Sequence, residues 1–204
     1  MTRLAQSAYS AAGARVRVRH VGEERQPVVI VDDATGIAGH LIEQASRTRL
    51  SPATSAGSHY PGILAPAPTA YLDFMVRLVL PLITAHFGTG PVSPVRARGN
   101  FSLVTTPPDA LSPGQRLPHV DTADALQFAT VHFLCPANRG GTGFFRHRAT
   151  GFETIDSERL PAYNVALDRE LAASSPPPAY IGADGHALFA AIGEVAAMPD
   201  RLIL

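Results

Sequence analysis

His119 and Asp121 stand one residue apart in the segment QRLPHVD, and together their side chains could bind a metal ion. On an extended strand, residues two positions apart point to the same face, so an imidazole nitrogen and a carboxylate oxygen would be neighbours. These groups are two of the three ligands of the 2-His-1-carboxylate arrangement, which leaves open positions on Fe(II) for a co-substrate and O₂. We therefore expect His119 and Asp121 to be metal ligands and catalytic residues.

A His-x-Asp motif is a weak signal by itself, because a histidine close to an aspartate is commonly just a hydrogen-bonded pair. The surroundings of this motif strengthen the metal interpretation. A proline-rich loop precedes it, and an apolar run over 126–135 and a Gly-Gly-Thr turn follow it. Gly140 and Gly141 fit a turn better than a phosphate site, since no helix start follows them.

The order of motifs along the chain resembles that of the Fe(II)/2-oxoglutarate-dependent oxygenases. The stretches concerned are YPGILAPAP, FSLVTTPP, QRLPHVD and GGTGFFRHRATGFE, within residues 59–204. They are most similar to the prolyl-4-hydroxylase-like branch, in particular to a bacterial group within it. The resemblance implies a double-stranded β-helix core of the jelly-roll or cupin-like type, Fe(II), 2-oxoglutarate, and hydroxylation of an unknown small-molecule or peptide substrate. His119 would be the first iron ligand and Asp121 the carboxylate ligand.

The resemblance also requires a distal histidine and, near it, an arginine or lysine that holds the far carboxylate of 2-oxoglutarate. No residue after His186 matches this pattern, and Leu204 is the last residue. We therefore expect the β-helix to be incomplete at its C-terminus. The third ligand would then lie beyond Leu204 or come from elsewhere.

His132 and Thr130 are candidates for contact with the co-substrate. Both lie in the run LQFATVHFLC, where alternation places them on one strand face. They could line a pocket there. The simpler interpretation of His132 is a histidine that forms hydrogen bonds within a mostly apolar face.

Arg146 and Arg148 are candidates for the cation that binds the co-substrate. Alternation along TGFFRHRA sends both arginines to one side of a strand and His147 to the other. A guanidinium group can bind a carboxylate through two parallel hydrogen bonds. The alternative is a solvated or acid-paired strand face, for example with Glu153. His186 lies in turn-like sequence and is expected at the surface.

The N-terminal segments that must support this site are predicted as strands and helices in alternation. Period-two alternation predicts an edge strand over 16–21, and a β-branched run predicts a second strand over 27–33. This second run ends in two aspartates that could cap a helix over 34–48. An irregular loop over 51–68 follows, and three-and-four spacing then predicts a buried helix over 71–83, bent at Pro81.

After Gly99 the residue pattern becomes typical of β-strands. Strands are predicted over 100–106, 126–135 and 142–149, a helix interrupted by Pro161 over 157–175, and a last strand at RLIL. We therefore predict an α+β protein in which helices pack on a mainly antiparallel sheet. Residues 1–204 would form a single domain, with a strand and helix part over 1–95 and the β-helix core over 96–204.

Composition excludes several classes of protein. Of the 204 residues, 46% are hydrophobic, and 17 basic residues balance 17 acidic ones, which predicts a globular protein with no electrostatic attraction for nucleic acid or membranes. One cysteine, Cys135, rules out an internal disulfide. The longest apolar stretch, FMVRLVLPLITAHF, is too short to cross a membrane, and we expect a cytoplasmic protein.

These observations make an Fe(II)- and 2-oxoglutarate-dependent oxygenase the leading hypothesis. A non-catalytic β-helix domain that binds a small molecule or a protein partner is the main alternative. A cupin-like hydrolase or isomerase that uses another metal is a third. The substrate and the oligomeric state stay open at this level.

Overall fold

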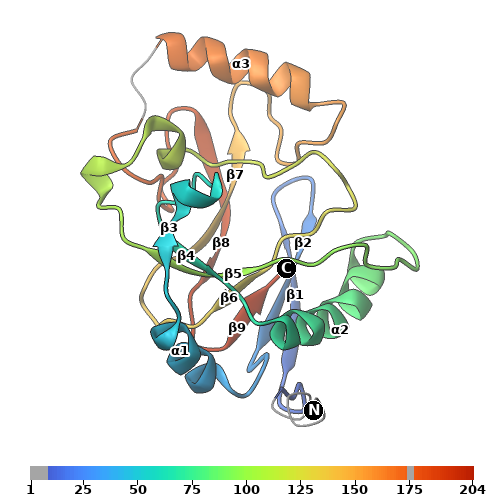
Figure 1. Cartoon of the computed structure of the whole chain (residues 1–204). Helices are drawn as coiled ribbons and strands as arrows, with labels where there is room; N and C mark the ends of the chain where they lie inside the picture. The colour runs from blue at the N-terminus through green and yellow to red at the C-terminus, as the bar shows by residue number, and fades with distance from the viewer. Residues whose placement is uncertain (1–8, 174–176) are drawn as a thin grey trace.

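Three antiparallel sheets and three α-helices make up the part of the chain that the structure, a computed structural model, describes: residues 9–173 and 177–204. Every strand pair is antiparallel, so the predicted α+β class is confirmed. No closed barrel forms among these residues. Figure 1 shows α3 at one end of the molecule, with α1 and α2 towards the other.

The central sheet has the strand order β1-β2-β9-β6. Its strands are β1 (Arg15–Val21), β2 (Gln26–Asp32), β9 (Arg201–Ile203) and β6 (Val131–Phe133). β2 is fully buried over its β-branched run, Val28–Val31, because it lies between two partners. β1 is the predicted edge strand, and its alternate arginines protect the exposed edge from pairing with another chain.

Two smaller sheets complete the β-structure. One contains β3 (Ser51–Pro52), β4 (Gly62–Pro66) and β5 (Asn100–Val104); the other is the hairpin of β7 (Gly141–His147) and β8 (Phe189–Ala196). The sequence prediction missed β4 and β8. β4 lies where a Pro- and Gly-rich composition predicted an irregular loop, and half of the eight residues of β8 are Ala or Gly, which favour strands only weakly. Both strands depend on partners far away in the sequence.

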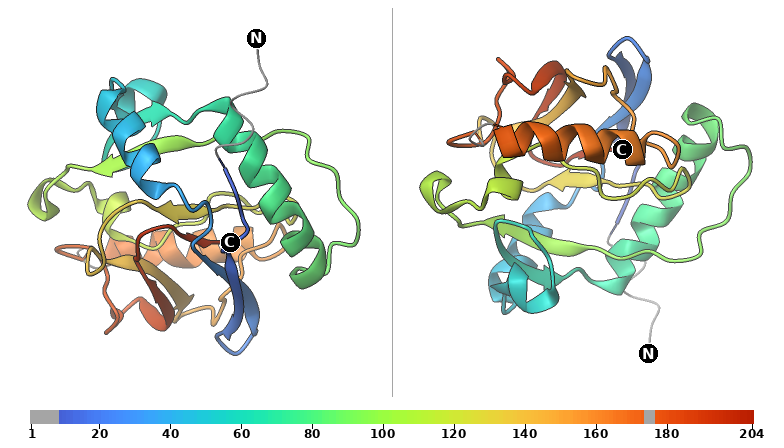
Figure 2. Two further views of the ribbon diagram at one scale, coloured as in Figure 1. Left: turned by 90° about the horizontal axis from the view of Figure 1, so that it is seen from below. Right: turned by 90° about the horizontal axis from the view of Figure 1, so that it is seen from above.

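The helices are α1 (Ala38–Arg47), α2 (Thr69–His86) and α3 (Leu160–Ala173). Pro81 lies inside α2 as predicted. Pro161, in contrast, does not interrupt its helix, because it is the second residue of α3, where a missing backbone N–H costs little. Figure 2 shows α2 and α3 on different sides of the strands.

The predicted aspartate cap of α1 is wrong. The residue before the helix is Ile37, and no side chain caps the helix there. Asp32 accepts hydrogen bonds from Arg17 and Arg201 instead, at 2.6 Å each, and Asp33 forms an ion pair with an arginine of β1. Both aspartate carboxylates therefore bind arginines of the sheet and do not cap the N-terminus of α1.

The main core lies where α2 packs on the central sheet. Phe74 and Met75 of α2 are buried against Val29 and Val31 of β2 and Leu202 of β9. Since β9 inserts between β2 and β6, the two parts predicted over 1–95 and 96–204 share one sheet. Within the described ranges, no helix has the length and apolarity needed to cross a membrane.

Two glutamates clamp the β1–β2 hairpin to the segment that follows β7. Glu153 accepts hydrogen bonds from the backbone N–H groups of Glu23 and Glu24, and an ion pair of 2.7 Å joins it to Arg146. Glu24 in return accepts the N–H group of Glu153 and an ion pair from Arg159 at 2.6 Å. Burial disfavours the ionised form of both carboxylates, but these hydrogen bonds outweigh it and hold both pKa values below their ordinary range.

We expect Glu153→Gln to lower the free energy of unfolding by about 2 kcal/mol, because charge-assisted hydrogen bonds are lost on a buried side chain. The pKa of Glu153 lies below its ordinary value of 4.5, so the stabilisation is complete above that pH and is lost as the pH falls through the folded pKa. Urea unfolding at a series of pH values measures both effects. Glu43→Gln, in an exposed ion pair with Arg47, is the control and should cost less than about 0.5 kcal/mol. Equal costs for the two variants would contradict the clamp.

Candidate functional site

His119 and Asp121 lie side by side on an exposed loop between the turn at Pro113–Arg116 and β6. Nε2 of His119 and Oδ1 of Asp121 are 3.5 Å apart, and the side chains are 79% and 61% exposed. The motif lacks the strand geometry that we assumed for it, because no neighbouring segment pairs with residues 118–121 in the described structure. The predicted convergence of the two side chains nevertheless occurs.

Neither side chain has another hydrogen bond or ion pair to the residues that the structure describes. The described residues also contain no group of three or more His, Cys, Asp or Glu side chains that could hold a metal ion. Residues 1–8 and 174–176 lie outside the description, and their sequence contains none of these four residue types. The donors near His119 therefore fit a metal centre only in part, with two ligands of three.

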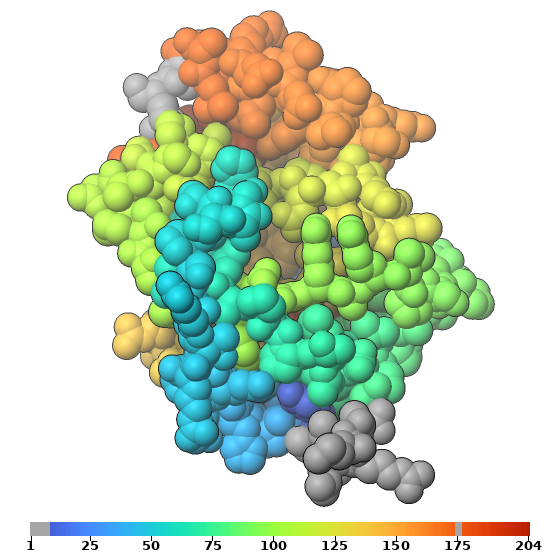
Figure 3. Space-filling model, in the orientation of Figure 1, coloured from blue at the N-terminus to red at the C-terminus, as the bar shows by residue number. Residues whose placement is uncertain are grey.

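The surface around this loop is hollowed. In the space-filling view, a depression lies between the yellow segment that contains the loop and the green and cyan segments opposite (Figure 3). Val120 and Leu126 of the loop are exposed, as are Leu103 and Val104 of β5. The loop of the exposed His–Asp pair thus also carries two exposed apolar side chains.

His132 belongs to a second His–Asp pair, which is buried. Its Nε2 lies 2.9 Å from Oδ1 of Asp200, and its Nδ1 lies 3.0 Å from the hydroxyl oxygen of Tyr71. Asp200 also accepts hydrogen bonds from the backbone N–H groups of Thr35 and Gly36 and from the Thr35 hydroxyl. We call these five residues, Tyr71, His132, Asp200, Thr35 and Gly36, the Asp200 network.

The charges of the Asp200 network follow from its donors. Burial opposes ionisation of Asp200, but the hydrogen bonds from His132, Thr35 and Gly36 outweigh it and hold the pKa of Asp200 below its ordinary value. Burial raises the pKa of Tyr71, and the nearby Tyr9 and Asp200 raise it further, so the Tyr71 hydroxyl keeps its proton. With Asp200 ionised, Nε2 of His132 donates to the carboxylate, and Nδ1 forms the second hydrogen bond of the ring with the Tyr71 hydroxyl.

His132 therefore forms hydrogen bonds within the fold, which was the simpler of its two interpretations, and it does not line a co-substrate pocket. Its side chain is 5% exposed, and both ring nitrogens are occupied. Thr130 lies just before β6 and is exposed, so the strand face predicted to join it to His132 does not extend that far. No hydrogen bond or ion pair joins either residue to His119 or Asp121 within the described ranges.

The arginines of the RHR run also have other partners. Arg146 forms ion pairs with Glu153 and Glu23, as in the alternative interpretation of an arginine paired with acidic side chains. Arg148 donates to the backbone oxygen of His186 at 3.0 Å. His147 points the other way, as alternation predicted, and is buried, with Nε2 2.7 Å from a carboxylate oxygen of Glu170.

His186 is half-buried rather than at the surface. Its Nδ1 accepts a hydrogen bond from the backbone N–H of Leu188, and its backbone oxygen accepts the one from Arg148. The sequence prediction missed Asp200, and it placed Tyr71 only at the start of a buried helix stripe. Asp200 stands in an ordinary turn, MPDR, and Tyr71 in an apolar helix stripe, so no spacing along the chain relates either residue to His132.

Comparison with known protein families matches residues 12–204 to the family described as "Family of unknown function (DUF6445)". No curated protein and no solved structure matches the chain.

We expect Asp200→Asn to lower the free energy of unfolding by about 3 kcal/mol, because it removes the charge that satisfies several buried donors. Asparagine tolerates the positive φ of 57° at this position, so the backbone conformation is kept. Asp121→Asn, in the exposed pair, should change stability by less than about 0.5 kcal/mol. Chemical denaturation of the two variants provides the comparison, and a larger loss for Asp121→Asn would overturn this assignment of roles.

Proposed function

We propose that this chain, which belongs to the DUF6445 family of unknown function, is an Fe(II)- and 2-oxoglutarate-dependent oxygenase-like domain in which His119 and Asp121 are two metal ligands. One observation carries the proposal. The imidazole and the carboxylate converge, with Nε2 and Oδ1 3.5 Å apart, while both side chains are exposed. A His–Asp contact this exposed contributes little to stability, and its nitrogen and oxygen atoms stay available to a cation.

The strand pairing supports a jelly-roll core. In a jelly roll, a long antiparallel hairpin folds over, so that strand pairs nest inside one another along the chain. The described structure contains two nested pairs, β7 with β8 inside β6 with β9. Continued outwards, this pattern would pair the segment before β6, which carries His119 and Asp121, with a strand that follows β9.

That outer strand is where we place the missing third ligand. The segment over 118–121 has no strand partner in the described structure, and neither of its metal-binding side chains has a second partner. A histidine on such a strand, or one from a partner chain, could complete the ligand set. The two donors present define no reaction step by themselves.

A non-catalytic binding domain is the second candidate. Two observations favour it: the His–Asp pair is widely open to solvent, and the described residues provide no third His, Cys, Asp or Glu beside it. Such a domain would use the hollow around the loop to bind a small molecule or a protein without turnover. A hydrolase or isomerase that uses the same ligands with Zn²⁺ or Mn²⁺ would differ from both in needing no 2-oxoglutarate.

Metal binding and co-substrate turnover in the full-length polypeptide test these proposals. We expect Fe(II), titrated under anaerobic conditions, to bind the wild type, and His119→Ala or Asp121→Ala to weaken the affinity by at least about 100-fold, because each removes a direct ligand. We also expect Fe(II)-dependent formation of succinate from 2-oxoglutarate, abolished in both variants.

His40→Ala and Asp109→Ala are matched controls, since they remove an exposed histidine and an exposed aspartate from other segments. Both should leave metal affinity unchanged. Metal binding that depends on His119 and Asp121 without any succinate would favour the non-catalytic domain. Fe(II) affinity that is the same in wild type and both variants would refute the metal site itself.

A further inference from the structure

We infer that Arg116 is a positioning residue for the His119–Asp121 pair. It is the last residue of the turn at Pro113–Arg116 and stands three residues before His119. Its guanidinium group ties this turn to the rest of the fold. The inference rests on the proposed function, because the pair that Arg116 positions is the pair that we propose binds a metal. Arg116 itself would touch neither the metal nor a substrate.

The guanidinium group of Arg116 donates three hydrogen bonds to backbone oxygens. Nε and Nη2 both donate to the oxygen of Leu111, at 3.0 and 2.7 Å, and Nη1 donates to the oxygen of Pro177 at 3.2 Å. Leu111 is only 2% exposed, and Pro177 is buried in the segment that follows α3, 61 positions further along the chain. In the described parts of the chain, no carboxylate pairs with Arg116. Its donors therefore serve the backbone, and only the fixed fork of a guanidinium group reaches both oxygens.

Gln115 ties the same turn to a third segment. Its Oε1 accepts a hydrogen bond from the backbone N–H of Ser112 at 2.9 Å, and its Nε2 donates to the backbone oxygen of His59 at 2.8 Å. Figure 1 shows the turn, in yellow-green, next to the cyan segment that precedes β4. The turn is thus held both by the segment before β4 and by the segment after α3.

The link from Arg116 to His119 is short and stiff. Leu117 packs against the buried apolar cluster that α3 forms with β8. Its φ of −99° and ψ of 149° are the extended values that a residue before proline favours. The ring of Pro118 fixes the φ angle of that residue. The place of His119 therefore follows from the place of the turn.

The loop after the pair is held more loosely. Its hydrogen bonds, such as the one from the backbone N–H of Asp124 to the Thr122 hydroxyl at 3.1 Å, stay within the loop. In the described structure, no hydrogen bond joins residues 119–127 to a distant segment. The ring of Phe128 then contacts the ring of Phe87 edge-on, with centroids 5.2 Å apart. The turn before the pair therefore decides where the pair stands.

A metal ion needs its ligands at distances that are defined to a few tenths of an ångström. Two ligands on a loop that is already fixed lose less conformational freedom when the metal binds, so the affinity is higher. Without Arg116, both ligands would be present but free to move apart. Loss of a residue that orients metal ligands typically weakens metal binding about 10- to 100-fold.

Metal affinity of variants of the full chain tests the inference. Fe(II) is titrated under anaerobic conditions, and we expect Arg116→Gln to bind it at least about tenfold more weakly than the wild type does. Arg116→Lys should also bind more weakly, because a single ammonium group does not replace the fork. Wild-type affinity in either variant would overturn the inference. If Arg116→Gln does not fold, Gln115→Ala replaces it, and unchanged affinity in that variant would overturn the inference equally.

A measurement without metal separates this inference from the proposed function. NMR order parameters of the backbone amides over 119–122 report how firmly the loop is held. We expect them to fall below about 0.6 in metal-free Arg116→Gln, while those of β2 and β9 stay unchanged. If the wild type binds no Fe(II), the metal site is refuted, and the order parameters alone decide whether Arg116 holds the loop. Order parameters equal to those of the wild type would show that it does not.

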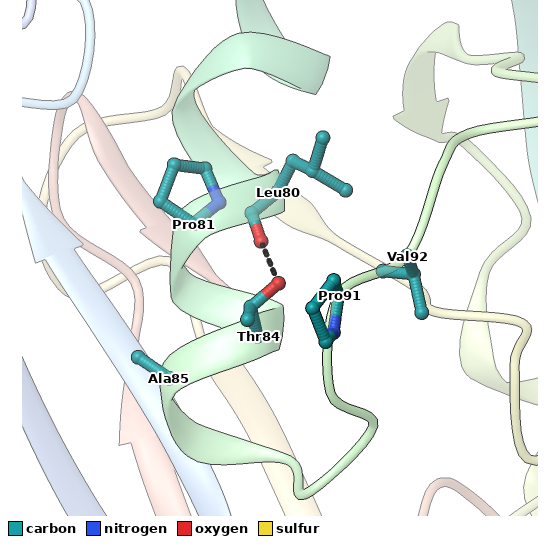
Figure 4. A pocket seen from close by; sticks show the side chains of 6 residues that line it. All are labelled: Leu80, Pro81, Thr84, Ala85, Pro91 and Val92. Atoms are coloured by element: carbon teal, nitrogen blue, oxygen red, sulfur yellow. Dashed lines mark hydrogen bonds between the residues drawn. The ribbon is translucent and has the colours of Figure 1, made fainter.

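Two control variants remove comparable hydrogen bonds elsewhere. Arg19→Gln removes an arginine of β1 that donates to the backbone oxygen of Glu194 at 2.9 Å. Thr84→Val removes the hydroxyl that donates to the backbone oxygen of Leu80 in α2 (Figure 4). Both controls should leave metal affinity and loop order unchanged, and thermal melting compares their stability with that of the other variants. If metal affinity falls in the controls in step with thermal stability, Arg116 acts only through overall stability and the positioning role is refuted.

Discussion

The buried carboxylate of Asp200 is the constraint on which the central sheet depends. It lies in the turn before β9 and accepts hydrogen bonds from the β2–α1 connection and from His132 of β6, which in turn is bonded to Tyr71 of α2. A charge buried this deeply is tolerated only when its donors are in place. The network therefore fixes β9 between β2 and β6 and holds α2 over them.

The same two residue types lie in opposite environments in two places. His132 and Asp200 are buried and have all their partners within the fold, so they stabilise one arrangement of four segments. His119 and Asp121 are exposed and have only each other in the described structure. Exposure, and not residue type, therefore separates a structural pair from a pair that is available to a metal.

Local patterns predicted much of the secondary structure. β1, β2, α1 and α2 were all found close to their predicted positions, because alternation and three-and-four spacing report which face of a segment is buried. β4 and β8 were missed, since their residues favour strands only when a distant partner supplies backbone hydrogen bonds. The His119–Asp121 pair was predicted from its spacing, but its strand was not found, because no neighbour pairs with that segment.

Four features could be predicted from the sequence alone. They are the α+β class, the edge position of β1, the buried stripe of α2 and the closeness of His119 to Asp121. These features depend on neighbours within a few positions. The fold alone decided several other pairings of charged and polar groups: Arg159 with Glu24, His147 with Glu170, and His132 with Asp200. The last pair is 68 positions apart, and its contact exists only because β9 returns to lie beside β6.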